Sequence, residues 1–252
     1  VSLFATIHEE STELLFELFI KSGLGAYIGK VNMDRNTPKY IVEDTDESIR
    51  KTERLILKYM DRSELVKPII TPRFAPTCTP KLLDNLGKLA LKYNLPVQSH
   101  LNENTSEIKW VHSLYLEYEN YASVYNAYNL FGQTKTIMAH CIYNTEPEID
   151  LMVKNKVYAA HCPHSNYNLS SGIMPLRKFL DRLVPVGLGT DVGGGHSTSI
   201  PKTIVSAIQS SKMKWLETNG EYLPITTSEA FYMGTKGGGS FFGRVGSFES
   251  GY

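Results

Sequence analysis

The sequence has 252 residues, and its 26 Lys and Arg balance 26 Asp and Glu, so the formal charge is zero. Hydrophobic residues at 42% and charged residues at 21% are ordinary for a globular protein. This balance argues against binding polymeric nucleic acid or an anionic membrane through bulk charge. No apolar run approaches the ~20 residues of a membrane span. We expect a cytoplasmic protein without membrane association, and the charge balance says nothing against a small neutral ligand.

The cysteines also indicate a cytosolic protein. Cys78, Cys141 and Cys162 form no C-x-x-C pair, so neither a zinc ribbon nor a disulfide scaffold is indicated. Reduced thiols in the cytosol are the simplest interpretation. The opening "VSLFATIHEE" is not a signal peptide, and it lacks a starting methionine. We expect the chain to start within a longer protein.

Apolar or β-branched runs alternate along the chain with segments of helical periodicity. The runs predicted as strands are residues 1–7, 25–32, 67–74, 96–100, 135–140, 157–162 and 185–191. The predicted helices are residues 11–23, 46–61, 79–94, 103–117, 145–156, 173–183 and 199–219. Thr79 and Thr145 are expected to cap helices. The one-sided apolar stripe of a helix packed on a sheet consists of Leu82, Leu86, Leu89 and Ala90.

This alternation predicts an α/β protein with a parallel sheet covered by helices. A β/α barrel and an open doubly wound sheet both fit it. No G-x-G-x-x-G follows the first strand, which disfavours a dinucleotide-binding sheet. Seven strands are one fewer than a complete eight-stranded barrel needs.

Ionisable residues stand at the ends of four later strands: His100, His140, His161 and Asp191. In a β/α barrel these ends converge on the mouth where active sites form. Imidazoles and a carboxylate meeting there suit Zn²⁺. Each could also be structural, with Asp191 starting a turn, but four on separate strand ends favour a shared site. The other histidines are interpreted as structural: His8, His112, His164 and His196.

Two further groups suggest chemistry. Glu103 lies three residues after His100, where a carboxyl group could shuttle a proton from a metal-bound water, or else cap the next helix. Arg73 and Phe74 end the third strand, and a guanidinium beside an aromatic ring suits a flat ligand with a carbonyl group. A structural ion pair is the alternative for Arg73.

The chain resembles the amidohydrolase superfamily, and within it the guanine deaminases of the eukaryotic type. The resemblance spans almost the whole length and rests on these segments in order: "FATIH", "GKVNMD", "ESIRKTERLI", "VKPIITPRFAPTC", "QSHLNEN", "MAHC", "AHCPHSNYNLSSG" and "GLGTDVGGG". "TPRF" and "HCPxSN…LSSG" are the more specific, whereas "SHxxE" and "GTD" are shared more widely. The resemblance implies a TIM-like (β/α)8 barrel of the metal-dependent hydrolase type.

The resemblance also implies roles at matching positions. His100 and Asp191 would be zinc ligands, with Asp191 also taking the proton of the metal-bound water. His140 would touch that water or the metal, and Glu103 would protonate the purine ring. Arg73 and Phe74 would hold guanine, aided by the backbone around Leu101 and Asn102. The implied activity is hydrolysis of guanine to xanthine and ammonia in purine catabolism or salvage, by a homodimer with one Zn²⁺ per subunit.

The sequence departs from this family in lacking the His-x-His pair of the first barrel strand, which supplies two more zinc ligands. Most of the accessory β-sandwich is also missing. We therefore expect residues 1–240 to be a partial barrel, and residues 241–252 to start the return to the sandwich. This chain alone would bind metal weakly and turn over poorly or not at all.

Alternative functions remain. One is a related deaminase or chlorohydrolase acting on a pterin, an adenine-like ring or a triazine, although Arg73 and Phe74 favour guanine. Another is a non-catalytic barrel fragment that serves as a binding subunit. The cytidine-deaminase fold is excluded, because its H-x-E…P-C-x-x-C signature is absent.

Overall fold

The computed structural model describes all 252 residues, which alternate between short parallel strands and helices. The chain divides into two compact units. Unit 1 comprises Val1–Ser99, Ser113–Glu119 and Ser123–Thr136. Unit 2 comprises His100–His112, Asn120–Ala122 and Ile137–Tyr252.

The strands are β1 (Ser2–Phe4), β2 (Ala26–Gly29), β3 (Val31–Asn32), β4 (Val66–Pro68), β5 (Thr71–Pro72), β6 (Val97–Leu101), β7 (Thr136–His140), β8 (Tyr158–His161) and β9 (Val186–Leu188). The helices are α1 (Glu9–Ser22), α2 (Thr45–Tyr59), α3 (Pro80–Tyr93), α4 (Thr105–Leu114), α5 (Tyr121–Ala127), α6 (Glu146–Asn155), α7 (Pro163–Asn168), α8 (Leu176–Asp181), α9 (Ile200–Glu217) and α10 (Thr227–Tyr232). A 3₁₀ turn spans Ala75–Thr77, and a π-helical turn, Met233–Gly237, follows α10. None of the helices is long and apolar enough to cross a membrane.

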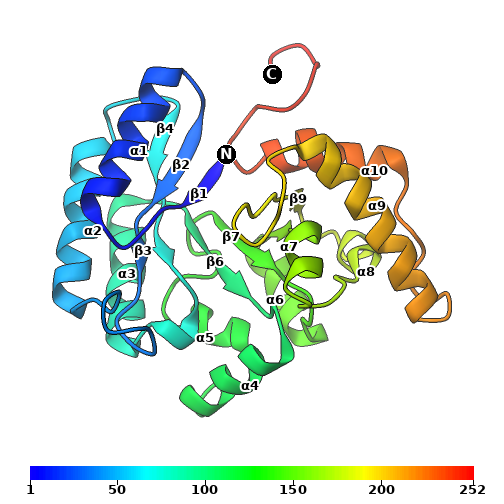
Figure 1. Ribbon diagram of the computed structural model, residues 1–252, viewed down its shortest axis with the longest axis horizontal. Helices are drawn as coiled ribbons and strands as arrows, with labels where there is room; N and C mark the ends of the chain where they lie inside the picture. Colours follow the sequence, from blue (N-terminus) through cyan, green and yellow to red (C-terminus); the bar gives the residue numbers. More distant parts are fainter. The chain divides into compact units, whose positions relative to one another are not determined.

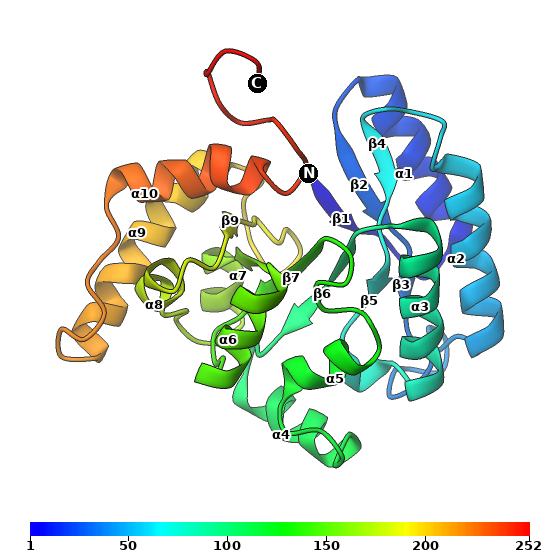
Figure 2. The same cartoon turned by 180° about the vertical axis from the view of Figure 1, so that it is seen from behind.

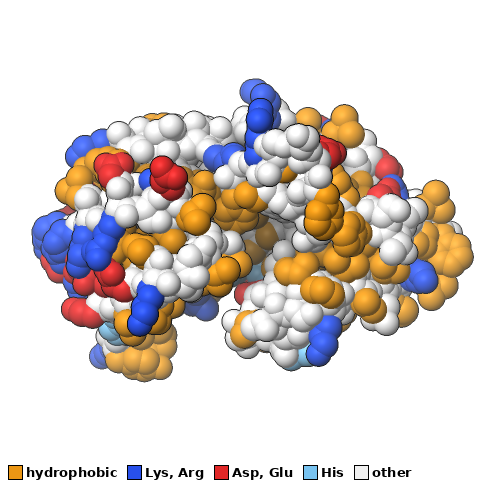
Figure 3. All heavy atoms as spheres, turned by 90° about the horizontal axis from the view of Figure 1, so that it is seen from above, with side chains coloured by type: hydrophobic (Ala, Val, Ile, Leu, Met, Phe, Trp, Pro, Cys, Tyr) orange, Lys and Arg blue, Asp and Glu red, His pale blue; other side chains and the backbone are white.

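In unit 1, β1, β2 and β4 pair in parallel, with Ala26 opposite Val66. Figure 1 shows α1 and α2 beside this sheet. The Phe16 ring stacks on Tyr59 with centroids 4.2 Å apart, which joins the two helices inside the core. Three ion pairs lie outside that contact. Glu9–Arg54 and Glu13–Lys58 join α1 to α2, and Glu17–Arg62 joins α1 to the turn that follows α2. Figure 3 shows the mixed charges of this region at the left of the molecule.

In unit 2, β7, β8 and β9 pair in parallel, in that order. Figure 2 shows α6, α7 and α8 close to these strands. Parallel pairing places the carboxyl ends of the strands at one edge, where α/β folds bind their ligands. The long helix α9 buries small polar residues, among them Ser206 and Ser210, which lie one turn apart and meet histidines of the β8–α7 segment.

Every strand predicted from the sequence is present, and the prediction of a mixed α/β fold with parallel sheets is confirmed. Two predicted strands are each split in two, giving β2 with β3 and β4 with β5. The helices α5, α7 and α10 were not predicted, because six or seven residues are too few to show a helical period. Thr79 caps α3 by accepting the Leu82 N–H, and Thr145 forms a capping box with Glu148, as predicted.

The apolar stripe of α3 gives a test of the core. Leu86 is 0% exposed, whereas Leu91 on the same helix is 47% exposed. We expect Leu86→Ala to lower the free energy of unfolding by about 2–5 kcal/mol, since it removes packed methyl groups and leaves a cavity. Leu91→Ala should change it by less than about 1 kcal/mol. Urea denaturation of both variants checks this, and equal losses would contradict the assigned packing.

Candidate functional site

The ionisable residues predicted at strand ends meet within unit 2. His100 lies in β6 and His140 ends β7, and their ring centroids are 5.4 Å apart. His140 Nε2 lies 3.7 Å from Glu103 Oε2 and 3.9 Å from Asp191 Oδ2. His140 is almost fully buried, whereas the two carboxylates are partly exposed. The structure therefore places His100, Glu103 and Asp191 around the buried imidazole of His140.

The backbone at these positions is strained. Asn102, His140, Cys141 and Asp191 all have left-handed conformations, with φ of 52°, 73°, 49° and 45°. Residues other than glycine adopt this region at a cost of order 1–3 kcal/mol each, and such strain clusters at functional sites. The sharp turns let each strand end abruptly and aim the side chain next to the turn.

The β6 end is tied to the β7 end through the backbone. The Leu101 carbonyl accepts the Cys141 N–H at 2.9 Å. The Asn102 carbonyl accepts the N–H groups of Ile142 and Tyr143 at 3.1 and 3.2 Å. These bonds fix the loop that carries Glu103, and they occupy the carbonyls of two residues that were predicted to help hold a purine. That predicted contact of Leu101 and Asn102 stays a prediction.

The Glu103 carboxylate is held from the segment that follows α7. Ser171 donates its hydroxyl to Glu103 Oε1 at 3.0 Å, and the Ser171 carbonyl accepts the Tyr143 hydroxyl at 2.7 Å. Gly172 has a φ of 139°, and a Cβ there would lie 2.3 Å from the Tyr143 oxygen. The "LSSG" segment thus acts as a clamp on Glu103, and only glycine fits after Ser171.

A second carboxylate lies one helical turn beyond Glu103. Glu107 is 4% exposed, and its Oε2 accepts the backbone N–H of Glu103 at 3.2 Å. Burial raises the pKa of Glu107 to about 7; the Glu103 charge adds to the rise, and a hydrogen bond from Tyr121 opposes it. Glu107 therefore supports the loop of the site while staying close to its own protonation point at neutral pH.

His161 has a structural role in packing and is not part of the cluster around His140. It is 1% exposed at the end of β8, and burial, followed by the nearby His140, lowers its pKa to about 3. Its Nε2 lies 3.5 Å from Ser210 Oγ of α9. Such an imidazole stays neutral, so we assign His161 to the packing between β8 and α9.

The cluster contains side chains of the kinds that bind metal ions. His100 and Asp191 offer the imidazole nitrogen and carboxylate oxygen that zinc accepts. No group of three or more His, Cys, Asp or Glu residues is arranged to hold a metal ion. The donors thus match zinc in kind but do not complete a four-coordinate site.

Arg73 and Phe74 belong to unit 1, directly after β5. The Arg73 guanidinium carbon lies 5.0 Å from the centroid of the Phe74 ring, and one of its nitrogens lies 3.9 Å from Met33 Sδ. The Arg73 carbonyl accepts a bond from the Ser99 hydroxyl at 3.2 Å. Arg73 is exposed and Phe74 half-buried, so both side chains present surface to solvent. Their predicted contact with a purine is not tested by this geometry.

Three residues that contact the candidate site were not predicted from the sequence: Glu107, Asn166 and Ser171. Asn166 Oδ1 lies 2.9 Å from His140 Nδ1, and both side chains are buried. The signals were present, since Asn166 and Ser171 lie inside "HCPHSNYNLSSG" and Glu107 follows Glu103 by four residues. The partners of Asn166 and Ser171, His140 and Glu103, lie 26 and 68 positions away along the chain, so no local pattern indicated these two pairs.

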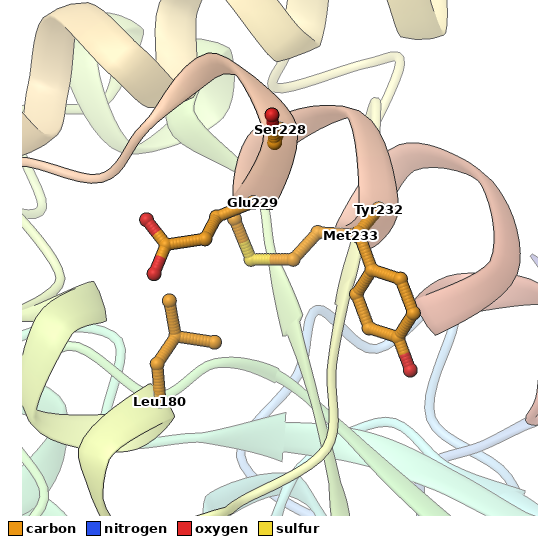
Figure 4. A pocket seen from close by; sticks show the side chains of 5 residues that line it. All are labelled: Leu180, Ser228, Glu229, Tyr232 and Met233. Atoms are coloured by element: carbon orange, nitrogen blue, oxygen red, sulfur yellow. The ribbon is translucent and has the colours of Figure 1, made fainter.

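An open surface pocket of about 280 Å³ lies elsewhere in unit 2. Figure 4 shows Leu180 of α8 facing Glu229, Tyr232 and Met233 at α10 and the following turn. The Glu229 carboxylate is already bonded to both terminal nitrogens of Arg177, at 2.8 and 2.9 Å. The pocket includes none of the candidate residues and offers no free charge, so it is not the site.

Glu107 predicts a pH-dependent stability. Its folded pKa of about 7 exceeds the ordinary value of 4.5, so the folded state holds this proton more tightly than the unfolded state. Stability from this group is present below about pH 4.5 and is lost as the pH rises to about 7, by up to ~3 kcal/mol.

Glu107→Gln keeps an acceptor for the Glu103 N–H but has no charge to bury. We expect its free energy of unfolding, relative to the unmodified protein, to rise between pH 5 and pH 8 by up to ~3 kcal/mol. Denaturant unfolding at both pH values measures this, with the exposed Glu117→Gln as control. A relative stability that is the same at both pH values would contradict the burial assigned to Glu107.

Comparison with known proteins adds to this geometry. The chain is 43% identical over 249 residues to a guanine deaminase of Dictyostelium discoideum, covering 97% of this chain and 55% of that protein. It is 40% identical over 254 residues to the guanine deaminase of Homo sapiens, covering 98% and 55%. The chain thus spans about half the length of these relatives.

A solved structure of a guanine deaminase is also similar to this chain. The crystal structure of guanine deaminase from C. acetobutylicum, with guanine bound in the active site, superposes with a TM-score of 0.98 at 56% identity, covering all of this chain and 60% of that one. The sequence profile of the Amidohydrolase family matches residues 2–252. Together with the strand-end cluster around His140, these matches show that the chain belongs to the amidohydrolase family.

Proposed function

We propose that the protein carrying this chain is a guanine deaminase, which removes the 2-amino group of guanine by hydrolysis to give xanthine and ammonia. The observation that carries the proposal is the placement of two carboxylates, Glu103 and Asp191, within 4 Å of one buried imidazole nitrogen of His140. The similarity to proteins named guanine deaminase, one with guanine bound, supports the choice of substrate.

The reaction needs protons moved in opposite directions. Water must lose a proton to attack the ring carbon, while the ring nitrogen and then the leaving amine must gain one. Glu103, held by Ser171, is our candidate for protonating the ring nitrogen. Asp191 is our candidate for taking the proton of water, and His140 Nε2 lies 3.7 and 3.9 Å from the carboxylates of Glu103 and Asp191.

Members of the amidohydrolase family are typically metal-dependent. We propose one zinc ion per subunit, with His100 and Asp191 as two of its ligands and further ligands from outside this set. When bound, zinc would lower the pKa of a coordinated water.

For substrate binding we propose Arg73 and Phe74 as contacts to guanine. A guanidinium can donate two hydrogen bonds to a ring carbonyl, and an aromatic ring can stack on a purine face. His100, Leu101, Asn102, Glu103 and Asp191 complete the proposed contact set. We also propose a cytoplasmic homodimer; three buried, unpaired cysteines suit a reducing compartment.

Two other functions stay open to test. A related ring, such as a pterin, an adenine-like compound or a triazine, would use the same proton-handling residues. A non-catalytic role would leave them without a substrate. The identity to guanine deaminases favours the first proposal over both.

The proposal is tested by incubating the purified protein with guanine and following xanthine by absorbance, together with intact mass and zinc content. We expect xanthine and ammonia in equal amounts and about one zinc per chain. Turnover of another heterocycle but not guanine would overturn the substrate. Zinc-loaded protein that acts on none of these rings would overturn the proposed activity.

Glu103→Gln tests the assigned acid. It keeps the size of the side chain and an oxygen for the Ser171 hydroxyl, but it has no proton to exchange. We expect kcat for guanine to fall by about 10²–10⁴ with little change in KM. The exposed Glu64→Gln is the matched control and should retain full activity. A kcat within a few-fold of the unmodified enzyme would remove Glu103 from the mechanism.

A further inference from the structure

The two nitrogens of the His140 ring have different neighbours. Nδ1 lies 2.9 Å from Asn166 Oδ1, which is the length of an N–H···O hydrogen bond. Nε2 lies 3.7 and 3.9 Å from the carboxylates of Glu103 and Asp191, too far for a direct hydrogen bond to either. The short contact is thus on the Asn166 side, and the open side faces the acid and the base.

A neutral imidazole carries one proton, and the hydrogen bond made by one nitrogen decides the state of the other. The Asn166 amide oxygen can only accept, so Nδ1 must donate to it. The lone pair then lies on Nε2 and points toward the space between Glu103 and Asp191. In this tautomer His140 Nε2 can accept a hydrogen bond but cannot donate one.

Asn166 is itself rigidly placed. It is 1% exposed in α7, its N–H bonds to the Cys162 carbonyl at 3.0 Å, and its carbonyl accepts the Ser171 N–H at 2.9 Å. The last bond links it to the residue that clamps Glu103. The short helix begins at Pro163, whose fixed φ suits a first helical position. One segment, residues 162–171, therefore touches both proton-handling groups.

We propose that Asn166 is a positioning residue that holds His140 as the Nδ1–H tautomer, with the Nε2 lone pair turned to the catalytic carboxylates. This deepens the proposed function and rests on it for its catalytic meaning. The tautomer itself is a property of this chain and is measurable without turnover.

The test is the ¹⁵N–¹H correlation spectrum of the histidine rings, recorded in alkaline buffer on the purified protein. Protonated and unprotonated ring nitrogens differ widely in ¹⁵N shift, and the spectrum of His140→Gln identifies the signals of His140. We expect a protonated Nδ1 and an unprotonated Nε2. A proton on Nε2 in the unmodified protein would overturn the proposal without any variant.

Two substitutions separate the hydrogen bond from packing. Asn166→Asp keeps an acceptor oxygen at the same reach, so the Nδ1–H tautomer should persist. Asn166→Leu keeps similar volume but has no acceptor, so His140 should shift to Nε2–H or to a mixture. Asn85→Ala, on the surface of α3 and bonded only to the Lys81 carbonyl of its own helix, is the control and should leave the signals unmoved.

An unchanged Nδ1–H signal in Asn166→Leu would show that other groups set the tautomer, and would overturn the proposal. If Asn166→Leu does not fold, Asn166→Ser, which removes the reach but keeps a polar group, is measured in its place with the same expected shift. A confirmed tautomer in a protein that does not deaminate guanine would reject the proposed function and leave the assignment of Asn166 intact.

Discussion

The site depends on one buried imidazole that is held on one side and left open on the other. His140 sits at the end of β7 with a left-handed backbone, and Asn166 fills the space at its Nδ1. A buried polar ring without a partner would be costly, so this hydrogen bond stabilises the ring in its buried position. Glu103 and Asp191 approach the His140 ring from the loops that follow β6 and β9.

Several hydrogen bonds hold the loop that carries Glu103 next to His140. Ser171 holds the Glu103 carboxylate, Glu107 holds the Glu103 backbone, and Asn102 ties the same loop to the segment after β7. These contacts restrain the loop that carries Glu103 beside His140.

The histidines of unit 2 differ in role because their surroundings differ. His161 is buried against a helix hydroxyl, and its lowered pKa keeps it neutral. His164 donates to or accepts from Ser206 at 2.6 Å, and burial again lowers its pKa. His100 and His140 face each other instead, with carboxylates nearby. The motif "HCPHSN" thus contains histidines that pack against α9, while "SHLNE" and "MAH" contain the histidines of the candidate site.

The sequence by itself determined the strand and helix alternation, the caps at Thr79 and Thr145, and the strand-end residues His100, Glu103, His140 and Asp191, because periodicity and local order are written in neighbouring residues. Only the tertiary structure separated His161 from this set and brought Asn166, Ser171 and Glu107 to it. It also split two predicted strands and added the short helices. These outcomes rest on burial and on contacts between residues as many as 68 positions apart, such as Ser171 with Glu103, which no local pattern encodes.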